Sequence, residues 1–270
     1  MLSVSASSPA LSARSLRKVF HVKAGLGRRP REIIAVDNVS FNIPPQQNFG
    51  IIGESGSGKS TIARMMLGLE VPTEGEISFF GTPYIRHRRT AERLAHARQI
   101  QMVFQDPYSS LDPRQTIGGG LKELLRLHGA DDHAARHESH RLLEQVGLSG
   151  RFADVRPLQL SGGQRQRVAI ARALAVKPRF ILLDEAVASL DVSIQAQILN
   201  MLAEIQKEMG VQYILISHNL AVVRQLTDLC IVMHRGKVVE EGRTEHVLLN
   251  PQHEYTIRLK ESIPTPSFEI

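Results

Sequence analysis

Along this chain of 270 residues, the spacing of apolar and polar residues follows a strand-like pattern in some segments and a helix-like pattern in others, and the two kinds of segment alternate. Residues 33–43, IIAVDNVSFNI, show the period of two that predicts a half-buried strand. Short apolar runs bounded by turn residues predict buried strands, at residues 48–53, 179–185 and 213–218. Residues 193–210 have the spacing of an amphipathic helix that ends at Gly210. Strands that alternate with helices indicate an α/β fold with a parallel sheet.

This alternation is interrupted between about residue 107 and residue 165. Residues 121–148 contain two helical segments separated near Gly129, and we therefore expect an inserted helical lobe at about 107–165. Outside it, residues 71–81 predict a turn and an edge strand, and residues 231–242 predict a hairpin. The expected division is an N-terminal tail at 1–11, one domain at 12–250 that contains the helical lobe, and a C-terminal tail at 251–270.

The composition, with 42% hydrophobic and 22% charged residues, is typical of a soluble globular protein. No apolar run approaches the roughly 20 residues that cross a bilayer, and the N-terminus lacks the pattern of a signal peptide, so we expect no membrane span. The net charge of +6 comes from scattered basic residues, and the densest cluster, at 84–98, is typical of a solvated helical face. We therefore expect no nucleic-acid partner. Cys230, the only cysteine, excludes an intrachain disulfide and is expected to be a small buried hydrophobe.

Residues 53–60, GESGSGKS, satisfy the pattern G-x-x-x-x-G-K-[ST] between a predicted strand and a predicted helix. The glycines allow backbone N–H groups to turn inward around a phosphate chain. Lys59 supplies a positive charge to the β- and γ-phosphates, and Ser60 offers a hydroxyl to Mg²⁺. A purely structural glycine turn is the alternative, but the full pattern in this context favours a nucleotide phosphate site.

Two carboxylates follow the apolar run at 180–183. Asp184 lies at the carboxyl end of a predicted strand, where open α/β sheets bind ligands, and it is placed to hold Mg²⁺. Glu185 follows directly and can orient or deprotonate an attacking water, so the pair favours hydrolysis over binding alone; two solvated acids are the alternative. Gln105 and His218 follow other predicted strands, and each alone is compatible with a structural role.

The segment LSGGQRQRVAIARALA, residues 160–175, is predicted to be a loop that becomes a helix. Ser161 and Gln164 fit a capping box, in which each side chain accepts a hydrogen bond from a backbone N–H at the helix start. The adjacent Gly162 and Gly163 are not required by that cap. The N–H groups and the positive dipole end of such a helix also suit an anion, so this segment is a second candidate phosphate site.

In order, the chain contains GESGSGKST, VFQD, LSGGQ, ILLDE, SLD and ISH. From about residue 12 to residue 260, this order and spacing resemble the nucleotide-binding subunits of ABC transporters. The resemblance implies a P-loop NTPase (RecA-like) core with a mainly parallel sheet, an N-terminal antiparallel β subdomain and an inserted α-helical subdomain. It also implies ATP and Mg²⁺ as cofactors, and ATP hydrolysis coupled to transport as the activity.

The resemblance assigns roles residue by residue. The Walker A loop, which would bind the phosphates of ATP, consists of Gly53, Glu54, Ser55, Gly56, Ser57, Gly58, Lys59, Ser60 and Thr61. The residues implied to take part in catalysis are Lys59, Gln105, Glu185 as the catalytic glutamate, and His218 as the switch histidine. The implied Mg²⁺ ligands are Ser60, Gln105 and Asp184. The residues that would meet the nucleotide of a second subunit are Ser161, Gly162, Gly163, Gln164 and the D-loop Asp191. Phe20 is the best-aligned candidate for stacking on adenine, with a place in the core as its alternative.

Residues that flank these motifs indicate which members of the ABC family the chain resembles. FQDPYSSLDPRQTIG, DEAVASLDVSIQAQILN and NPQHEYTIRLKESIP resemble the ATPase subunits of oligopeptide, dipeptide and nickel importers. The implied partners are a second ATP-binding subunit, a different homologous chain in preference to a second copy, two integral-membrane permeases and, indirectly, a solute-binding protein. The implied location is the cytoplasmic face of a bacterial inner membrane. The alternatives are the ATPase of an exporter and a soluble ABC ATPase that acts on nucleic acid or the ribosome, and these strings favour the importer.

Overall fold

The computed structural model describes residues 8–22, 31–84, 89–187 and 191–262. The chain forms two compact units, the first made of residues 1–86 with 214–270 and the second of residues 87–213. The second unit therefore contains the expected helical lobe together with the segments on either side of it. Most of the predicted N-terminal tail, residues 1–7, lies outside the described residues.

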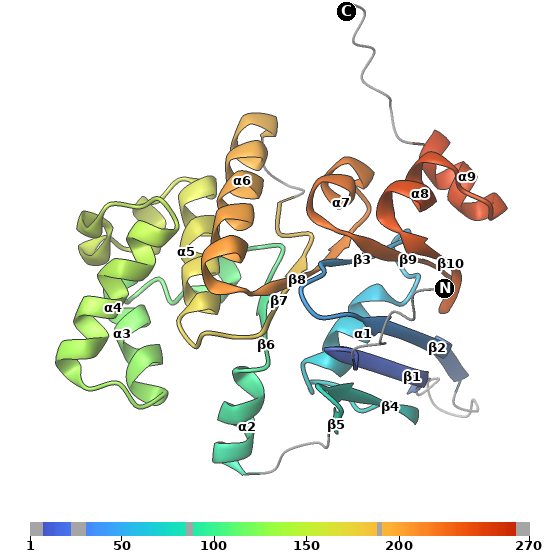
Figure 1. Ribbon diagram of the computed structural model, residues 1–270. Helices are drawn as coiled ribbons and strands as arrows, with labels where there is room; N and C mark the ends of the chain where they lie inside the picture. The colour runs from blue at the N-terminus through green and yellow to red at the C-terminus, as the bar shows by residue number, and fades with distance from the viewer. Residues whose placement is uncertain (1–7, 23–30, 85–88, 188–190, 263–270) are drawn as a thin grey trace, which may run out of the picture. The chain divides into compact units, whose positions relative to one another are not determined.

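An antiparallel sheet opens the first unit, as the resemblance implies (Figure 1). Its strands are β1 (Leu11–Val22), β2 (Arg31–Ile43), β4 (Glu74–Phe79) and β5 (Thr82–Pro83), in the order β2-β1-β4-β5. The last six residues of β2 show the predicted period of two, since Phe41 and Ile43 are buried and Ser40 and Asn42 are exposed. The prediction of an edge strand at 71–81 is wrong, because β4 lies between β1 and the two-residue β5.

The first unit also contains part of a mixed sheet. β3 (Phe49–Ile52) pairs in parallel with residues Ile214 to Ser217 of β8 (Gln212–Ser217) and with β9 (Leu229–His234). All four residues of β3 are buried, as expected for a strand with neighbours on both sides. β9 and β10 (Lys237–Arg243) form the predicted antiparallel hairpin. The helices that accompany these strands are α1 (Lys59–Met66), α7 (Leu220–Leu226) and α8 (Thr244–Leu249).

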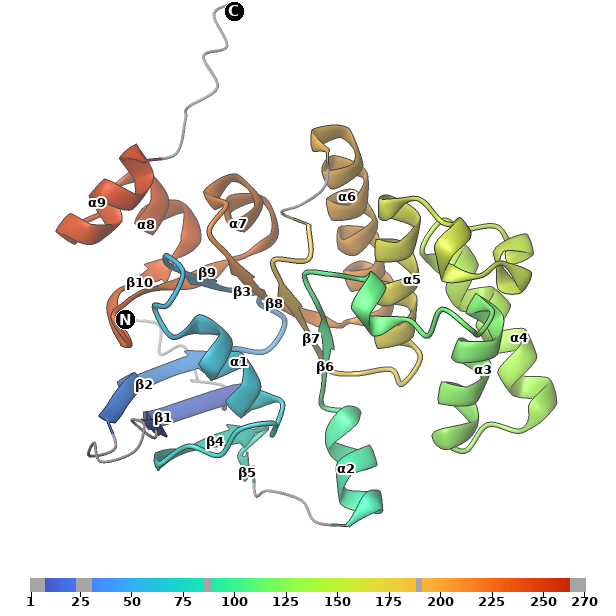
Figure 2. The same ribbon diagram turned by 180° about the vertical axis from the view of Figure 1, so that it is seen from behind.

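The segment predicted to be a C-terminal tail contains one more helix, α9 (Glu254–Glu261). Tyr255, Thr256 and Leu259 are buried on one side of it, with the spacing of an amphipathic helix. In both ribbon views α8 and α9 lie close to each other beside β10 (Figures 1 and 2). Residues 251–262 are therefore folded and packed against the rest of the first unit. The polar, proline-containing sequence of this segment does not predict that.

The second unit is mainly helical, with two paired strands. β6 (Ile100–Val103) and β7 (Phe180–Asp184) are parallel, and β7 is the strand predicted at 179–185. The helices are α2 (Thr90–Ala97), α3 (Ile117–Leu127), α4 (Asp132–Gln145), α5 (Gly162–Leu174) and α6 (Val192–Met209), with short 3₁₀ turns at Tyr108–Ser110, Gly150–Asp154 and Pro157–Gln159. α3, α4 and α5 pack side by side (Figure 2). α6 ends at Gly210, whose φ of 65° is the left-handed C-cap that the sequence predicted.

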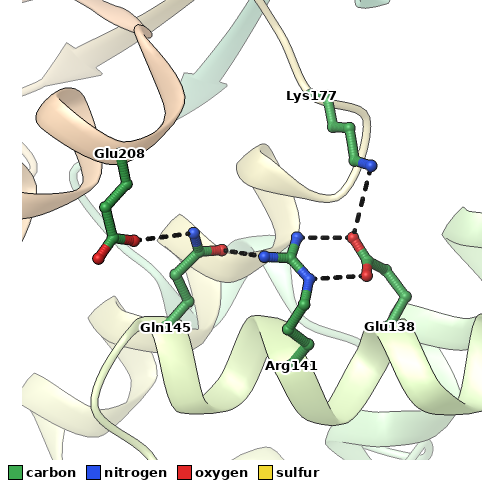
Figure 3. Close-up of polar contacts among 5 residues, drawn as sticks. All are labelled: Glu138, Arg141, Gln145, Lys177 and Glu208. Atoms are coloured by element: carbon green, nitrogen blue, oxygen red, sulfur yellow. Dashed lines mark hydrogen bonds and ion pairs between the residues drawn. The ribbon is translucent and has the colours of Figure 1, made fainter.

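A chain of polar contacts joins three parts of the second unit (Figure 3). Glu138 and Arg141 of α4 form two hydrogen bonds of 2.7 Å each, and Lys177, which follows α5, lies 3.9 Å from the same carboxylate. Gln145 extends these contacts: its side chain accepts a hydrogen bond from Arg141 and donates one to Glu208, near the end of α6. The hydrogen bonds from Arg141 lower the pKa of Glu138 and outweigh the opposing effect of partial burial. This network ties the carboxyl ends of α5 and α6 to α4.

None of the described helices combines the length and the apolar character needed to span a membrane.

Candidate functional site

The phosphate loop predicted at residues 53–60 lies between β3 and α1 in the first unit. β3 ends at Ile52 and α1 begins at Lys59, so the loop has the strand-to-helix context that its pattern requires. Gly53, Gly56 and Gly58 have φ angles of 152°, 79° and 106°, a range that residues with a side chain rarely adopt. The backbone turns of this loop therefore coincide with its glycines.

Lys59 points back over the loop that precedes it. Its Nζ donates hydrogen bonds to the carbonyl oxygens of Gly53 and Glu54, both at 2.7 Å, and lies 3.5 Å from the hydroxyl of Ser57. The residue is only 6% exposed. The loop thus surrounds a buried ammonium group with acceptors, and the oxygens of a phosphate are acceptors of the same kind.

The start of α1 has the properties of an anion site. Its N-cap is Gly58 in the left-handed region, no side chain caps the helix, and its first turn contains no acidic residue. The positive end of the helix dipole is therefore not offset by a carboxylate of that turn. Ser60, which the sequence nominates as a Mg²⁺ ligand, is exposed in this first turn, and Thr61 is half-buried. The backbone N–H groups at the start of α1 thus suit a phosphate, and the hydroxyl of Ser60 beside them suits Mg²⁺.

His218 is brought to the same sheet edge as the phosphate loop. Ile52 of β3 and Ser217 of β8 are register partners in parallel strands, and the loop and His218 follow them directly. His218 is exposed, and Asn219 after it caps α7 by accepting from the N–H groups of Ala221 and Val222. Carboxyl ends of neighbouring parallel strands are the usual ligand-binding edge of such sheets.

A second group of candidate residues lies at the carboxyl ends of β6 and β7, in the second unit. Val103 and Leu183 are register partners, so Asp184 directly after Leu183 and Gln105 two residues after Val103 share one edge. Asp184 and Glu185 are half-buried and Gln105 is exposed. Glu185 has a φ of 48°, the left-handed region that a residue with a side chain adopts only at a cost. Such strain is concentrated at functional positions, and here it falls on the predicted catalytic glutamate.

The capping box predicted at the start of α5 is confirmed. The Ser161 hydroxyl accepts from the N–H of Gln164 at 3.3 Å, and the Gln164 side chain accepts from the N–H of Ser161 at 2.9 Å. Gly162 is exposed, and a Cβ placed there would meet nothing within 4 Å. Gly163 is buried, and its Cβ would lie 2.8 Å from Cγ2 of Ile194 in α6. Close packing inside the chain therefore accounts for Gly163, whereas nothing described in the chain accounts for Gly162.

Two further candidates have distinct settings. Asp191 is exposed at the N-cap of α6, where its carbonyl rather than its side chain accepts a hydrogen bond, from the N–H of Gln195. The two residues before it in the SLD string, Ser189 and Leu190, lie outside the described residues. Phe20 is half-buried on β1, with Nζ of Lys18 4.9 Å from its ring centroid. Phe20 is therefore not in the core, and its ring already has a cation as a neighbour.

One contact of the phosphate loop was missed from the sequence. The hydroxyl of Tyr255 in α9 accepts a hydrogen bond from the backbone N–H of Glu54 at 3.0 Å. The only sequence signal near it is the string NPQHEYTIRLKESIP, which resembles the importer ATPases but does not by itself indicate a contact with the phosphate loop.

The donor set is compatible with Mg²⁺ held jointly with a nucleotide. Within the described ranges, no group of three or more His, Cys, Asp or Glu side chains could hold a metal ion by itself. Mg²⁺ usually keeps several waters and is bound by one or two protein oxygens together with substrate phosphates. The hydroxyl of Ser60 in the first unit and the carboxylate of Asp184 in the second are each an oxygen of this kind.

Comparisons with known proteins agree with these observations. The model of the ABC transporter family matches residues 36–188. The chain is 46% identical over 258 residues to the glutathione import ATP-binding protein GsiA of Salmonella paratyphi A, a match that covers 95% of this chain and 41% of that relative. It is 41% identical over 262 residues to the dipeptide transport ATP-binding protein DppF of Haemophilus influenzae, covering 97% of this chain and 80% of the relative.

Among solved structures, the dimeric, post-hydrolysis state of the ATP-binding cassette MJ0796 bound to ADP and Pi is similar, with a TM-score of 0.74 and 31% identity. That match covers 87% of this chain and 98% of the other. The likeness confirms the expected P-loop NTPase fold. The chain spans less than half the length of the glutathione import relatives that it matches.

Proposed function

The chain belongs to the ABC transporter family, and we propose that it binds and hydrolyses ATP as the nucleotide-binding subunit of a membrane importer. The observation that carries this proposal is the phosphate loop between β3 and α1, in which a buried Lys59 and an uncapped helix start converge beside His218. The importer class is supported by the relatives, one a glutathione import protein and one a dipeptide transport protein. Peptides and peptide-like solutes are therefore the proposed cargo, in preference to nickel.

ATP binding begins with an exchange of hydrogen bonds at Lys59. The ammonium group now bound to the carbonyls of Gly53 and Glu54 turns toward the β- and γ-phosphates. Backbone N–H groups of the loop and of the first turn of α1 surround the phosphates, where the helix dipole favours negative charge. Phe20 is the proposed contact of the adenine ring, and the half-buried position of its side chain on β1 supports that assignment.

Hydrolysis depends on the residues at the carboxyl ends of β6, β7 and β8. Glu185 orients the attacking water and accepts its proton, and its left-handed backbone supports this role. Ser60, Asp184 and Gln105 would hold Mg²⁺ together with the phosphates, and the ion would supply positive charge against the phosphoryl oxygens. His218 donates a hydrogen bond to the γ-phosphate as its charge redistributes.

The Ser161–Gln164 turn and Asp191 act on a nucleotide held by a second subunit. Because Ser161 and Gln164 satisfy each other, the turn is rigid before any ligand arrives. Gly162 is exposed beside open space, so a γ-phosphate can approach the backbone there. Closure of two subunits around ATP buries two nucleotides, and loss of the γ-phosphate lets the subunits part. The second subunit is a different homologous chain, and a second copy is the other form that the same geometry admits.

The proposed membrane partners are two permeases, which place this chain on the cytoplasmic face of a bacterial membrane. Residues 106–110 follow Gln105 and lead to a cavity of about 720 Å³ in the second unit, lined by residues that include Ser110, Asp112, Thr116, Leu124 and Arg172. Arg172 of α5 donates a hydrogen bond to the carbonyl of Ser110, which links this loop to the helix that begins in the LSGGQ segment. Phe104, Tyr108 and Leu127 are 44%, 41% and 58% exposed, and a permease segment would cover such apolar side chains.

Two substitutions test the proposal. Lys59→Ala should abolish ATP binding, whereas Glu185→Gln should keep ATP binding, abolish steady-state hydrolysis and favour an ATP-bound dimer. Glu144→Gln on the exposed side of α4 is the matched control and should turn over as the wild type does. Wild-type turnover by Glu185→Gln would remove it from the mechanism, and unchanged ATP binding by Lys59→Ala would refute the site itself.

The shared site has its own test. A Ser161→Arg chain and a Lys59→Ala chain are each expected to be inactive, and cross-linked mixed dimers of the two should recover part of the activity. Recovery requires that one intact composite site forms from the two chains. Inactive mixed dimers, once cross-linking is demonstrated, would contradict a role of Ser161 across an interface between two copies of this chain.

A further inference from the structure

The C-terminal helix α9 contacts the phosphate loop through one side chain. Tyr255 is 5% exposed, and its hydroxyl accepts the hydrogen bond from the N–H of Glu54 at 3.0 Å across 201 positions of sequence. Burial raises the pKa of this phenol, so it stays neutral throughout the physiological range. Glu54 is itself exposed, so water would take this N–H if the phenol did not.

The N–H group that donates to Tyr255 belongs to the same peptide group whose carbonyl accepts a hydrogen bond from Lys59. The carbonyl of Gly53 and the N–H of Glu54 are the two ends of one planar peptide unit. The carbonyl end accepts from Nζ of Lys59 at 2.7 Å, while the N–H end donates to Tyr255. A rotation of this peptide would break both hydrogen bonds together, so Tyr255 fixes the direction in which the carbonyl points at Lys59.

This peptide needs an external constraint because it follows Gly53. With a φ of 152°, Gly53 occupies backbone space that other residues rarely use, and glycine loses more conformational freedom on ordering than any other residue. The carbonyl of Met233 in β9 lies so close that a Cβ on Gly53 would be 2.3 Å from it. Only glycine therefore fits at position 53. The conformational freedom that glycine brings to the backbone has to be restricted by contacts from outside the loop.

Tyr255 is in turn held by the β9–β10 hairpin. Its ring lies 4.0 Å from that of His234 at the end of β9, measured between centroids. Glu240 of β10 accepts from the N–H groups of Gln252 and His253 at 2.9 and 3.1 Å, and the His253 ring caps α9 by accepting from the N–H of Tyr255. The position of the phenol is therefore fixed by two strands and by a helix cap.

We propose that Tyr255 is a positioning residue for ATP binding: it orients the Gly53–Glu54 peptide and through it the ammonium group of Lys59. The inference rests on the proposed function of the phosphate loop. The C-terminal segment is then part of the nucleotide site, although no atom of it needs to touch the nucleotide. Loss of the phenol hydroxyl leaves the loop able to form but not held in one orientation.

The variant that tests this is Tyr255→Phe, which keeps the ring and its packing on His234. We expect its dissociation constant for mant-ATP with Mg²⁺, and its KM for ATP, to rise about three- to tenfold, while kcat changes by less than about twofold. The matched control is Tyr213→Phe. Tyr213 is fully buried and its hydroxyl donates to the carbonyl of Leu202 at 2.9 Å, so this variant loses a comparable hydrogen bond outside the phosphate loop. The control should unfold at a lower temperature with unchanged KM.

Amide hydrogen exchange gives a second readout, and its measurement on the wild type does not depend on folding of the variant. In the wild type the Glu54 amide should exchange slowly for an exposed residue, and in Tyr255→Phe it should exchange faster, with other loop amides less affected. Fast exchange of Glu54 in the wild type would overturn the inference. So would equal KM values for Tyr255→Phe and the wild type. Lys59→Ala separates this failure from that of the site: if Lys59→Ala abolishes binding while Tyr255→Phe is neutral, the proposed function stands and the role of Tyr255 falls.

Discussion

The two helix starts that carry the phosphate motifs, those of α1 and α5, are built in opposite ways. α1 begins at a left-handed Gly58 with no side-chain cap, whereas α5 begins at Ser161 in a complete capping box. In α1 a lysine supplies a positive charge, and in α5 the Ser161 and Gln164 side chains satisfy two of the backbone donors. At the start of α1 no side chain satisfies a backbone donor, whereas at the start of α5 two side chains do so.

This difference explains how one chain can carry two segments suited to phosphate. The α1 loop has the charge and the N–H groups to hold a nucleotide tightly. In the α5 turn the capping box already satisfies two of the backbone donors, so the turn offers shape and a hydroxyl rather than strong binding. We infer that the first holds ATP and that the second closes on ATP held elsewhere. Substitutions at equivalent positions of the two helix starts can break or sharpen this contrast.

The largest effect on stability is expected at the start of α1. In Gly58→Ala the residue would keep a φ of 106°, and its Cβ would lie 2.5 Å from the carbonyl oxygen of Ala35. We expect the free energy of unfolding to fall by about 2–4 kcal/mol and ATP binding to be lost. Gly56→Ala is the control: its φ is 79° but its Cβ would meet nothing within 4 Å. Urea denaturation measures both variants, and equal costs would show that the clash with Ala35 is not decisive.

A smaller loss is expected at the start of α5. Ser161→Ala removes the hydroxyl that accepts from the N–H of Gln164, which should lower the free energy of unfolding by about 1 kcal/mol. Thr116→Ala removes the cap of α3, which accepts from the N–H of Gly119, and should cost a similar amount. Only Ser161→Ala should also lower the ATPase rate. Equal ATPase rates in the two variants would reduce Ser161 to a helix cap.

The sequence predicted those features of this comparison that depend on local pattern. The phosphate loop, the capping box and the end of α6 at Gly210 each follow from residues a few positions apart, and the structure has all three helix ends where they were expected. Residue spacing also placed Asp184 at the end of β7 and His218 directly after β8, because short apolar runs between turns form buried strands.

Features that depend on distant contacts could not be predicted in this way. Strand β4 was expected at a sheet edge, and only the pairing of the two-residue β5 with it makes that wrong. The contact between Tyr255 and Glu54 joins positions 201 residues apart, and α9 has only eight residues with which to show a helical period. Gly163 is likewise explained by its close packing against Ile194 of α6, a contact that no local pattern of the sequence contains.

The pair of Glu138 and Arg141 in α4 offers a test in which pH separates charge from packing. The pKa of Glu138 is lowered by its hydrogen bonds from Arg141, so this carboxylate stabilises the fold above its ordinary pKa of 4.5 and ceases to do so as pH falls through the lowered value. Glu138→Gln should cost about 0.5–1 kcal/mol at neutral pH, and the difference from the wild type should shrink below about pH 4. A pH-independent difference in denaturation midpoints would assign the effect to packing instead.

The smallest effect on stability is expected at Gly162. A substitution there should change the ATPase rate much more than the free energy of unfolding. Gly162→Ala adds a methyl group to open space in the first turn of α5, so the free energy of unfolding should change by less than about 0.5 kcal/mol. If a nucleotide held by a second subunit approaches the backbone here, that methyl displaces it, and the ATPase rate should fall about ten- to a hundredfold. Gly120→Ala in α3, whose Cβ has only one neighbour, at 3.4 Å, is the control and should leave the rate unchanged. A stable Gly162→Ala chain with full turnover would mean that the contrast between the two helix starts lies in folding alone.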